Sequence, residues 1–521
     1  MRGAIHGVIL AVSCLVPVFA VAQTAPVGAA PVAAAPRLNF TPGEMAFARQ
    51  IAPNPDLAAF YGSRGLVPVF TAPESAVLRD AVRGAINASA RHGIPSARYD
   101  LDDSELSYAR ALALYLRDMT GGVIRPGAAD PDIKFQPNRP SIPGLMNDIV
   151  ADPAALDGVQ PRHPAYLALQ RALVGDERLA VPAHLPRVPS GLWRHGMEGD
   201  DVTAMRVRLA SIGFDSPADD PRVYDDGLLQ SVMLYQRAAG LPVDGVAGPQ
   251  TIARLNGDMA QGRNTRGILI AMERLRWMPD ADPMARQVWV NIPEYSTTII
   301  DNGVEVFRTR SVVGKDDPDM RTPEFSDVMA HVVVNPQWNV PRSMTVRDYL
   351  PRLQANRNAV PHLEVVDNRG RVVPRDQIDF SRFTAQNFPY RLRQQPSDDN
   401  ALGLVKFIFP NRWNIYLHDT PTKRLFGQQM RAHSNGCIRI GDPFDLAYAL
   451  LSQQTDNPQA MFRRALDSKR ETWLKLNPGV PVHLVYFTTW PDASGRLQTF
   501  PDVYGRDGRV WAAMQRAGIG G

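Results

Sequence analysis

The sequence predicts a multidomain α+β protein in which helical domains come first and a mainly β region follows. Three observations support this fold class. The chain has 521 residues, which suggests two to four domains, and its 44% hydrophobic content is ordinary for a globular protein. Apolar residues recur at helical spacing over much of residues 39–279. From residue 287, short β-rich runs separated by turn residues replace that pattern.

Residues 1–22 have the features of a secretory signal peptide. Arg2 is followed by an apolar run over residues 8–22 that ends in a small-x-small cleavage site and is too short for a comfortable transmembrane helix. Removing this segment would lower the formal charge from +4 to +3 and leave Cys437 as the one cysteine. A lone thiol in an exported protein fits a reactive role better than a structural one. Lipidation of Cys14 is the alternative interpretation.

A linker and a helical scaffold follow. We assign the linker to residues 23–38, because residues 23–36 are uncharged and rich in Ala, Pro and Val. We assign the scaffold to residues 39–190. The clearest helix there is expected over residues 106–119, whose apolar side chains share one face, and Gly121 is expected to end it.

Residues 191–257 form a compact unit with its own signature. Apolar residues from Val202 to Ile212 make one amphipathic stripe, and a second helix is expected from residue 229. The run over residues 240–251 then places an Asp-Gly turn before Pro249, which suits the first position of a third helix. This run resembles the signature of the three-helix peptidoglycan-binding domain of many cell-wall enzymes. The alternative is a helical spacer without a ligand.

After a return to helical spacing over residues 258–284, the mainly β domain is expected over residues 285–495, and residues 496–521 are expected to be a C-terminal tail. Several short strands argue for a sandwich or an open barrel. The Asp-Asn-Gly sequence at residues 301–303 is a strong hairpin signal. Strands are predicted at residues 288–292, 297–300, 304–308, 312–315, 329–334, 406–409, 413–417 and 480–490.

The chemistry of the chain is concentrated in two short segments of that domain. His418 closes one apolar run, and Cys437 lies 19 residues later in a Ser-x-Gly-Cys turn that begins at Ser434. A cysteine nucleophile needs a nearby base to take its proton. Gly436 allows a sharp turn, so backbone N–H groups of residues 435–437 could stabilise an oxyanion. The backbone carbonyl of Asp419, rather than its carboxylate, is expected to fix the imidazole tautomer.

These segments resemble the signature of the L,D-transpeptidase family, the YkuD-type catalytic domain, which is a His, then 14 to 17 residues, then Ser/Thr-His-Gly-Cys. Here 15 residues separate His418 from Ser434, and Asn435 stands where the family most often has a second His. Fragments of the helical scaffold also resemble the larger Gram-negative members. The resemblance implies a YkuD-like β sandwich with Cys437 as the nucleophile and His418 as the base.

Around this pair the sequence predicts a cleft and a lid. Residues 322–325 resemble the family's Thr-Pro turn, and residues 335–341 offer an aromatic wall that includes Trp338, which could equally be core. Arg439 could bind a substrate carboxylate or make a structural ion pair. Tyr416 and Ser434 complete the expected substrate-binding residues. Residues 342–405 interrupt the strands where larger family members carry a capping subdomain, so a lid insert is expected.

The resemblance implies an exported, periplasmic cell-wall enzyme that joins peptidoglycan stem peptides by 3-3 cross-links through a cysteine thioester, with carbapenems as inhibitors. The alternatives are an L,D-carboxypeptidase, a transferase of stem peptide to a lipoprotein, or a silent wall-binding protein. No cofactor is implied. No metal site is predicted, because His418, His433 and Cys437 have no further ligands at zinc spacing. No dense basic cluster indicates nucleic-acid binding.

Overall fold

The computed structural model describes residues 39–174, 181–182, 184–239, 241–256, 265–278 and 282–520. The predicted signal peptide and linker lie outside the described residues. The chain divides into two compact units, one ending at Val67 and the other beginning at Pro68. In the first unit, helix α1 (Pro42–Ile51) begins with a capping box between Thr41 and Glu44, and α2 (Pro55–Gly62) begins at the N-cap Asn54.

The scaffold region of the second unit is helical, as the sequence predicts. The helices are α3 (Ala76–Asn87), α4 (Glu105–Gly121), α5 (Pro126–Ala129), α6 (Ile142–Ala151) and α7 (Pro164–Val174). The expected apolar face of α4 is buried, with Leu112, Tyr115 and Met119 each at most 1% exposed. The helix ends where Gly122 adopts a positive φ of 80°.

The compact unit over residues 191–256 contains three helices around its own core, α8 (Asp200–Ala210), α9 (Asp226–Ala238) and α10 (Pro249–Leu255). Pro249 is the first residue of α10, as predicted. Helix α9 begins three residues before the predicted residue 229, and its buried face is centred on Leu228, Val232 and Tyr235, whereas Leu229 is only partly buried. The Gln236 side chain fixes the Asp-Gly turn by accepting the Gly245 N–H at 2.9 Å.

Helix α12 (Thr265–Arg276) is buried on every side from Gly267 to Arg276 and packs against α7. Its charged residues are therefore paired inside the protein: Arg276 with Glu273, and Arg274 with Glu324 and Asp507. A helix that is buried all round is a core element rather than a connector.

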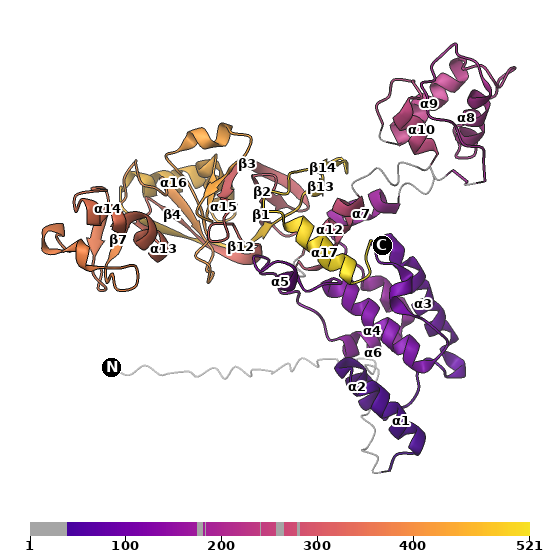
Figure 1. Cartoon of the computed structure of the whole chain (residues 1–521), viewed down its shortest axis with the longest axis horizontal. Helices are drawn as coiled ribbons and strands as arrows, with labels where there is room; N and C mark the ends of the chain where they lie inside the picture. Colours follow the sequence, from indigo (N-terminus) through magenta and orange to yellow (C-terminus); the bar gives the residue numbers. More distant parts are fainter. Residues whose placement is uncertain are drawn as a thin grey trace, which may run out of the picture. The chain divides into compact units, whose positions relative to one another are not determined.

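The β domain is a nine-stranded mixed sheet in which the strands from β3 to β2 form a closed circuit of pairings, with β10 attached to β3. The order is β10-β3-β11-β9-β8-β4-β12-β1-β2, and β2 also pairs with β3, which closes the circuit. Figure 1 labels β1, β2, β3, β4 and β12 of this sheet. The strands are β1 (Gln287–Asn291), β2 (Ser296–Asp301), β3 (Val304–Gly314), β4 (Phe325–Val334), β8 (Val405–Ile408), β9 (Leu417–His418), β10 (Ala432–Ser434), β11 (Ile438–Ile440) and β12 (Thr472–Val485). Helices α15 (Pro443–Leu451) and α16 (Pro458–Asp467) contribute Leu446, Leu450 and Phe462 to its core.

Two expectations for this domain need correction. A strand was expected over residues 413–417, but β9 covers only Leu417–His418, because the chain turns before it and Asn414 has a positive φ of 54°. The expected C-terminal tail, residues 496–521, is structured: β14 (Leu497–Thr499) pairs with β13 (Thr489–Pro491) of the preceding segment, and α17 (Arg506–Arg516) follows. Arg506 is fully buried, so α17 belongs to the folded core.

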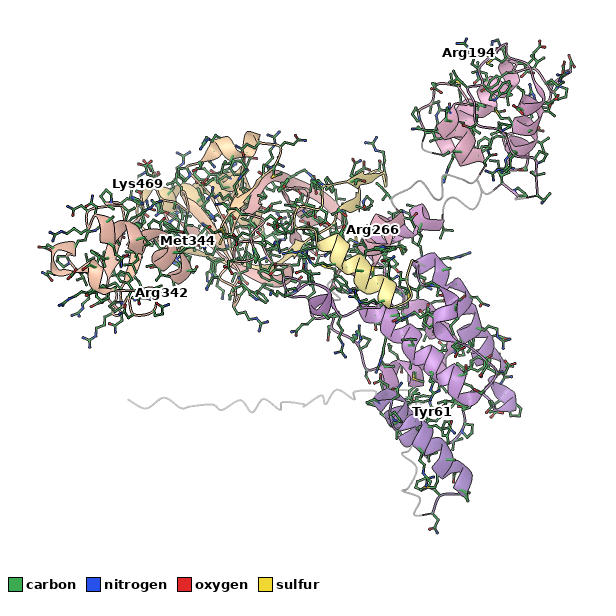
Figure 2. The ribbon with its side chains drawn as sticks, viewed as in Figure 1. Tyr61, Arg194, Arg266, Arg342, Met344 and Lys469 are labelled. Carbon is green, nitrogen blue, oxygen red and sulfur yellow. The ribbon has the colours of Figure 1, made fainter. Side chains whose placement is uncertain are left out.

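The lid insert is a small subdomain with its own core. It contains α13 (Arg342–Met344), the π-helical turn η6 (Thr345–Tyr349), α14 (Leu350–Ala355), β6 (Glu364–Val366) and β7 (Arg391–Gln394), and its sheet has the order β5-β7-β6 with β5 at Trp338–Asn339. Leu353, Phe380 and Leu392 lie in its core. Arg342, which Figure 2 labels together with Met344, ties α13 to the insert by donating to the Phe388 carbonyl at 2.7 Å.

Candidate active site

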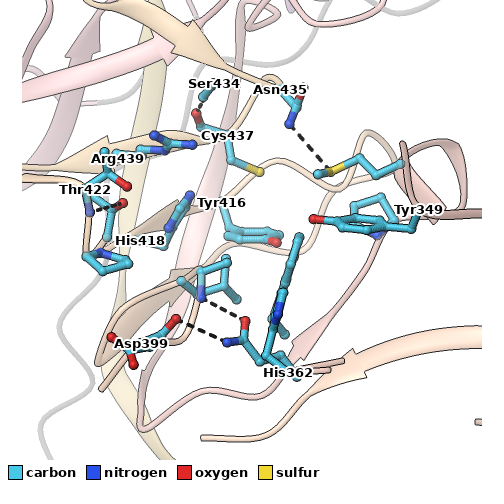
Figure 3. Close-up of a pocket in the computed structure, with 18 residues that line it drawn as sticks. Tyr349, His362, Asp399, Tyr416, His418, Thr422, Ser434, Asn435, Cys437 and Arg439 are labelled. Carbon is cyan, nitrogen blue, oxygen red and sulfur yellow. Dashed lines mark hydrogen bonds between the residues drawn. The ribbon is translucent and has the colours of Figure 1, made fainter. Parts of the chain in front are cut away.

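The sheet and the insert together line one cavity of about 640 Å³ (Figure 3). Strand β9, the turn before β11 and the residues around them supply one wall, and the insert supplies Met344, Tyr349 and His362. Nothing in the pattern of the insert sequence singled out these three residues, because they belong to irregular or short elements without a repeating apolar spacing. The residues that line the cavity are Trp338, Pro341, Met344, Tyr349, His362, Gln394, Asp399, Ala401, Leu402, Tyr416, His418, Thr420, Pro421, Thr422, Ser434, Asn435, Cys437 and Arg439.

Parallel pairing of β9 with β11 explains why the predicted residues come together. Arg439 lies opposite His418 in the register, and Ile438 lies opposite Leu417. Cys437 and Tyr416 are two residues back along their strands from Arg439 and His418. The Ile438 N–H donates to the Tyr416 carbonyl at 3.1 Å, which continues the pairing to that point. Side chains two residues apart on a strand share a face. The four side chains therefore project from one face into the same cavity (Figure 3).

His418 is buried and held as a neutral imidazole. Its Nδ1 lies 2.5 Å from the backbone carbonyl oxygen of Asp419, as expected from the sequence, so Nδ1 carries the proton and Nε2 is the basic nitrogen. The ring also interacts with the backbone of Leu402. Burial, with the nearby Arg439 guanidinium as a second cause, lowers the pKa of His418 to about 4. The Asp419 carboxylate is used elsewhere, since it accepts the Leu404 N–H at 2.9 Å and the Lys423 ammonium at 2.6 Å.

The thiol of Cys437 is also neutral in the free site. Burial raises the pKa of Cys437 to about 11, although hydrogen bonding from Tyr416 works in the opposite direction. The Tyr416 ring also contacts the imidazole of His418, with centroids 5.7 Å apart. The Cys437 thiol donates to the Asn414 carbonyl at 3.6 Å and lines the same cavity as His418. A neutral base in the same cavity can take the thiol proton during attack on a carbonyl, so the arrangement does not require a preformed thiolate.

The turn before Cys437 offers fewer free N–H groups than the sequence suggested. The Gly436 N–H donates to Ser434 Oγ at 3.1 Å, and Ser434 Oγ donates to the Cys437 carbonyl at 2.5 Å. Ser434 is 2% exposed, so it braces the turn although it also lines the cavity. The Asn435 side chain reaches Met344 of the insert, with Nδ2 3.6 Å from Sδ.

Arg439 carries an uncompensated charge in the cavity wall. It forms no salt bridge with any residue that the structure describes, and its Nε is buried without a hydrogen-bond partner among them. Desolvation lowers its pKa. A structural ion pair, the alternative that the sequence left open, is therefore not found in the described chain, and the guanidinium is available to an anionic ligand.

Trp338 and the segment 322–325 were both expected to line the cleft, and the structure separates them. Trp338 is 6% exposed and combines both interpretations, because it lines the cavity and packs in the core of the insert. The segment from Thr322 to Phe325 does not line the cavity. Thr322 is completely buried beneath the nucleophile turn, and Glu324 is buried in the ion pairs with Arg274 and Arg506.

Within the described ranges, no group of three or more His, Cys, Asp or Glu side chains is arranged to hold a metal ion. In the same part of the chain, no helix has both the length and the apolar character that crossing a membrane requires.

Family comparisons assign the three regions separately. Residues 285–470 match the family described as "L,D-transpeptidase catalytic domain". Residues 55–173 match "Scaffold domain", and residues 198–255 match "Putative peptidoglycan binding domain". The β domain is an L,D-transpeptidase catalytic domain.

One curated relative is a protein of Haemophilus influenzae named "Putative L,D-transpeptidase", which is 35% identical over 248 residues. The match covers 47% of this chain and 49% of that protein, so the chain spans about half the length of this relative. Two solved structures of L,D-transpeptidases are also similar to parts of the chain. That from Xylanimonas cellulosilytica is 17% identical with a TM-score of 0.16 and covers 58% of this chain and 100% of its own. That from Mycobacterium smegmatis is 13% identical with a TM-score of 0.17 and covers 38% and 58%.

Proposed function

We propose that this protein is an exported peptidoglycan L,D-transpeptidase that forms 3-3 cross-links between stem peptides. The observation that carries the proposal is that Cys437, neutral His418 and Arg439 share one face of an L,D-transpeptidase catalytic domain, and that Arg439 has no salt bridge with a residue that the structure describes. A thiol, a base and a carboxylate receptor in one cavity are the groups that acyl transfer from an anionic peptide requires.

In the first step Cys437 attacks the carbonyl carbon on the L-centre of the third stem residue, diaminopimelate. The Sγ–C bond forms while the thiol proton passes to Nε2 of His418, and a backbone N–H of the turn stabilises the oxyanion. The C–N bond to the terminal D-alanine then breaks. His418 returns the proton to the departing nitrogen, which leaves a thioester and free D-alanine.

In the second step the side-chain amine of another stem peptide attacks the thioester. The new C–N bond forms, the C–S bond breaks, and the proton lost by the amine returns through His418 to Sγ. Water as the acceptor would make the protein an L,D-carboxypeptidase, and a lipoprotein lysine would make it a lipoprotein transferase. The insert favours a positioned amine because a covered site excludes water.

The remaining groups of the cavity have supporting roles in this proposal. Arg439 binds a stem-peptide carboxylate, and Trp338 and Tyr416 provide aromatic surface for the peptide. Asn435 and Ser434 shape the turn that holds the nucleophile. A carbapenem would acylate Cys437 in place of the stem peptide.

The helical unit over residues 198–255 supports a cell-wall location. A module that binds peptidoglycan beside a catalytic domain raises the effective concentration of substrate at the active site. The predicted signal peptide would deliver the protein to the periplasm, where its substrate lies.

The test is mass spectrometry of the purified protein incubated with a disaccharide-tetrapeptide. We expect dimers with loss of D-alanine, no product from Cys437→Ala, and a rate about 10²–10⁴-fold lower from His418→Gln. His433→Gln is the matched control, because His433 directly precedes the motif, does not line the cavity and forms a hydrogen bond with the Met430 carbonyl, so the variant should keep nearly the full rate. Tripeptide without dimers would support the carboxypeptidase instead. Dimers from Cys437→Ala would refute the proposed mechanism.

A further inference from the structure

Thr322 forms a hydrogen bond with the carbonyl group of Gly436. This bond fixes the orientation of the Gly436–Cys437 peptide group. Thr322 Oγ1 donates to the Gly436 oxygen at 2.8 Å, and both residues are buried. In a planar trans peptide, the carbonyl and the following N–H point in opposite directions. Since the Gly436 carbonyl points to Thr322 in the interior, the Cys437 N–H points towards the cavity that Cys437 lines.

The Cys437 N–H is the donor of this turn that is best placed for an oxyanion. It forms no hydrogen bond within the described part of the chain, whereas the Gly436 N–H is occupied by Ser434 Oγ. It also belongs to the residue whose sulfur attacks. An oxyanion formed on a carbonyl carbon bonded to that sulfur lies close to the same residue's N–H.

Thr322 can hold this peptide group in a fixed orientation because its own hydroxyl, N–H and carbonyl groups all form hydrogen bonds with neighbouring residues. Its hydroxyl accepts the Gly314 N–H at 2.9 Å, which leaves the single hydroxyl proton for Gly436. Its N–H lies 3.4 Å from the Tyr504 hydroxyl, which donates to the Gly314 carbonyl at 2.6 Å. Its carbonyl accepts from Arg506 Nη2 at 2.9 Å.

Thr322 is itself held in place by elements that are distant in the sequence. Arg506, at the start of α17, is 0% exposed and pairs with Glu324 at 3.2 Å and Asp132 at 3.4 Å. The scaffold chain around Asp132 adds two backbone bonds, from the Glu324 N–H to the Asp132 carbonyl and from the Lys134 N–H to the Glu324 carbonyl. A displacement of α17 or of the loop around Asp132 would therefore move Thr322, and with it the turn that carries Cys437.

We propose that Thr322 is a positioning residue for acyl transfer at Cys437. Its hydroxyl orients the Gly436–Cys437 peptide so that the Cys437 N–H stabilises the oxyanion, and α17 together with residues 130–134 holds Thr322 in place. The inference rests on the proposed attack of Cys437 on a carbonyl group.

The experiment compares Thr322→Val, which has nearly the same shape but no hydroxyl, with Thr322→Ser, which keeps the hydroxyl. Two probes are used on the full chain. p-Nitrophenyl acetate acylates Cys437 through an oxyanion and releases p-nitrophenolate, whereas iodoacetamide alkylates the same sulfur with release of iodide and without an oxyanion. The single-turnover burst of p-nitrophenolate measures the acylation step. We expect Thr322→Val to lower the acylation rate constant about 10–100-fold, with little change in the ester concentration that gives half of the maximal rate. Its alkylation rate should stay within about twofold of wild type, and Thr322→Ser should restore most of the acylation rate.

Acylation of Thr322→Val at the wild-type rate would overturn the proposal, and so would an equal loss of acylation and alkylation, which would indicate a general defect of the turn. If Thr322→Val does not fold, Thr322→Ala enters the same comparison. If neither variant folds, Thr322 is a structural residue and the proposal fails. A wild-type protein that reacts with the ester but not with stem peptides would refute the proposed function and leave this inference standing.

Discussion

At the scale of the residue, the protonation states of His418 and Cys437 determine how the site works. A pKa of about 4 for the imidazole and about 11 for the thiol leaves both groups neutral over a wide range around pH 7. The sequence identified the pair through its spacing, but it could not give these states. They depend on burial and on Arg439, which reaches His418 only because β9 and β11 are neighbours.

These states lead to a prediction for the reactivity of Cys437 towards iodoacetamide. Because alkylation requires the thiolate, the rate should rise about tenfold per pH unit from pH 7 towards pH 10, without a plateau below pH 9. The pseudo-first-order rate is measured by the mass increase of the intact protein, with Cys437→Ala as the unreactive control. A plateau that begins below pH 7 would instead indicate a preformed thiolate–imidazolium pair.

At the scale of the element, α17 is where interpretation of the sequence failed and where the structure is most informative. The segment Arg506–Arg516 opens with charged residues and contains Gly508, which is typical of an exposed tail. Its first two residues are buried instead, because Arg506 and Asp507 find partners in Glu324 and Arg274. No local pattern reveals such partners, since they lie more than 180 residues away. The strong β hairpin at residues 301–303 was predictable because its turn chemistry is entirely local, with Asn302 and Gly303 both at positive φ.

The buried pair predicts that Arg506→Leu strongly destabilises the protein. Removing Arg506 breaks its buried ion pairs with Glu324 and Asp132 and leaves Glu324 with Arg274 as its one remaining cation among the described residues. Breaking a buried ion pair in this way costs about 3–5 kcal/mol of the free energy of unfolding. Urea denaturation followed by circular dichroism measures this. Arg516→Leu is the matched control on the exposed end of the same helix and should change stability by no more than about 0.5 kcal/mol. Equal losses of stability in the two variants would show that the ion pairs of Arg506 do not contribute to the free energy of unfolding.

At the scale of the whole molecule, the sequence supported the order of helical scaffold, three-helix unit and β domain, because each has a different apolar period or turn signature. It did not reveal the side-chain contacts between the scaffold and the β domain. His163, at the start of α7, lies against Trp289 of β1 with ring centroids 5.6 Å apart. Trp289 also contacts His483 of β12 at 5.2 Å. The two histidines contact the same tryptophan, and His483 is 2% exposed whereas His163 is partly buried.

This junction predicts that acid weakens the folded protein. Burial lowers the pKa of His483 to about 4, with a smaller contribution from His163, and its Nε2 has no partner among the described residues. The unfolded chain therefore takes up a proton below about pH 6.5, while the folded protein does not until about pH 4. The stabilisation is complete above pH 6.5 and is lost as the pH falls towards 4. It amounts to about 2 kcal/mol of the free energy of unfolding between pH 7 and pH 5 for this residue.

His483→Phe isolates that contribution because it keeps an aromatic ring against Trp289 but cannot be protonated. Losing the hydrogen bond between His483 and Ser326 shifts stability by a constant amount, so only the difference between the two pH values matters. The free energy of unfolding of wild type and variant is measured in urea at pH 7 and pH 5. The variant should lose about 2 kcal/mol less than wild type over this interval. Equal losses would mean that His483 is already protonated in the folded protein at pH 5, and that water reaches the junction between the scaffold and the catalytic domain.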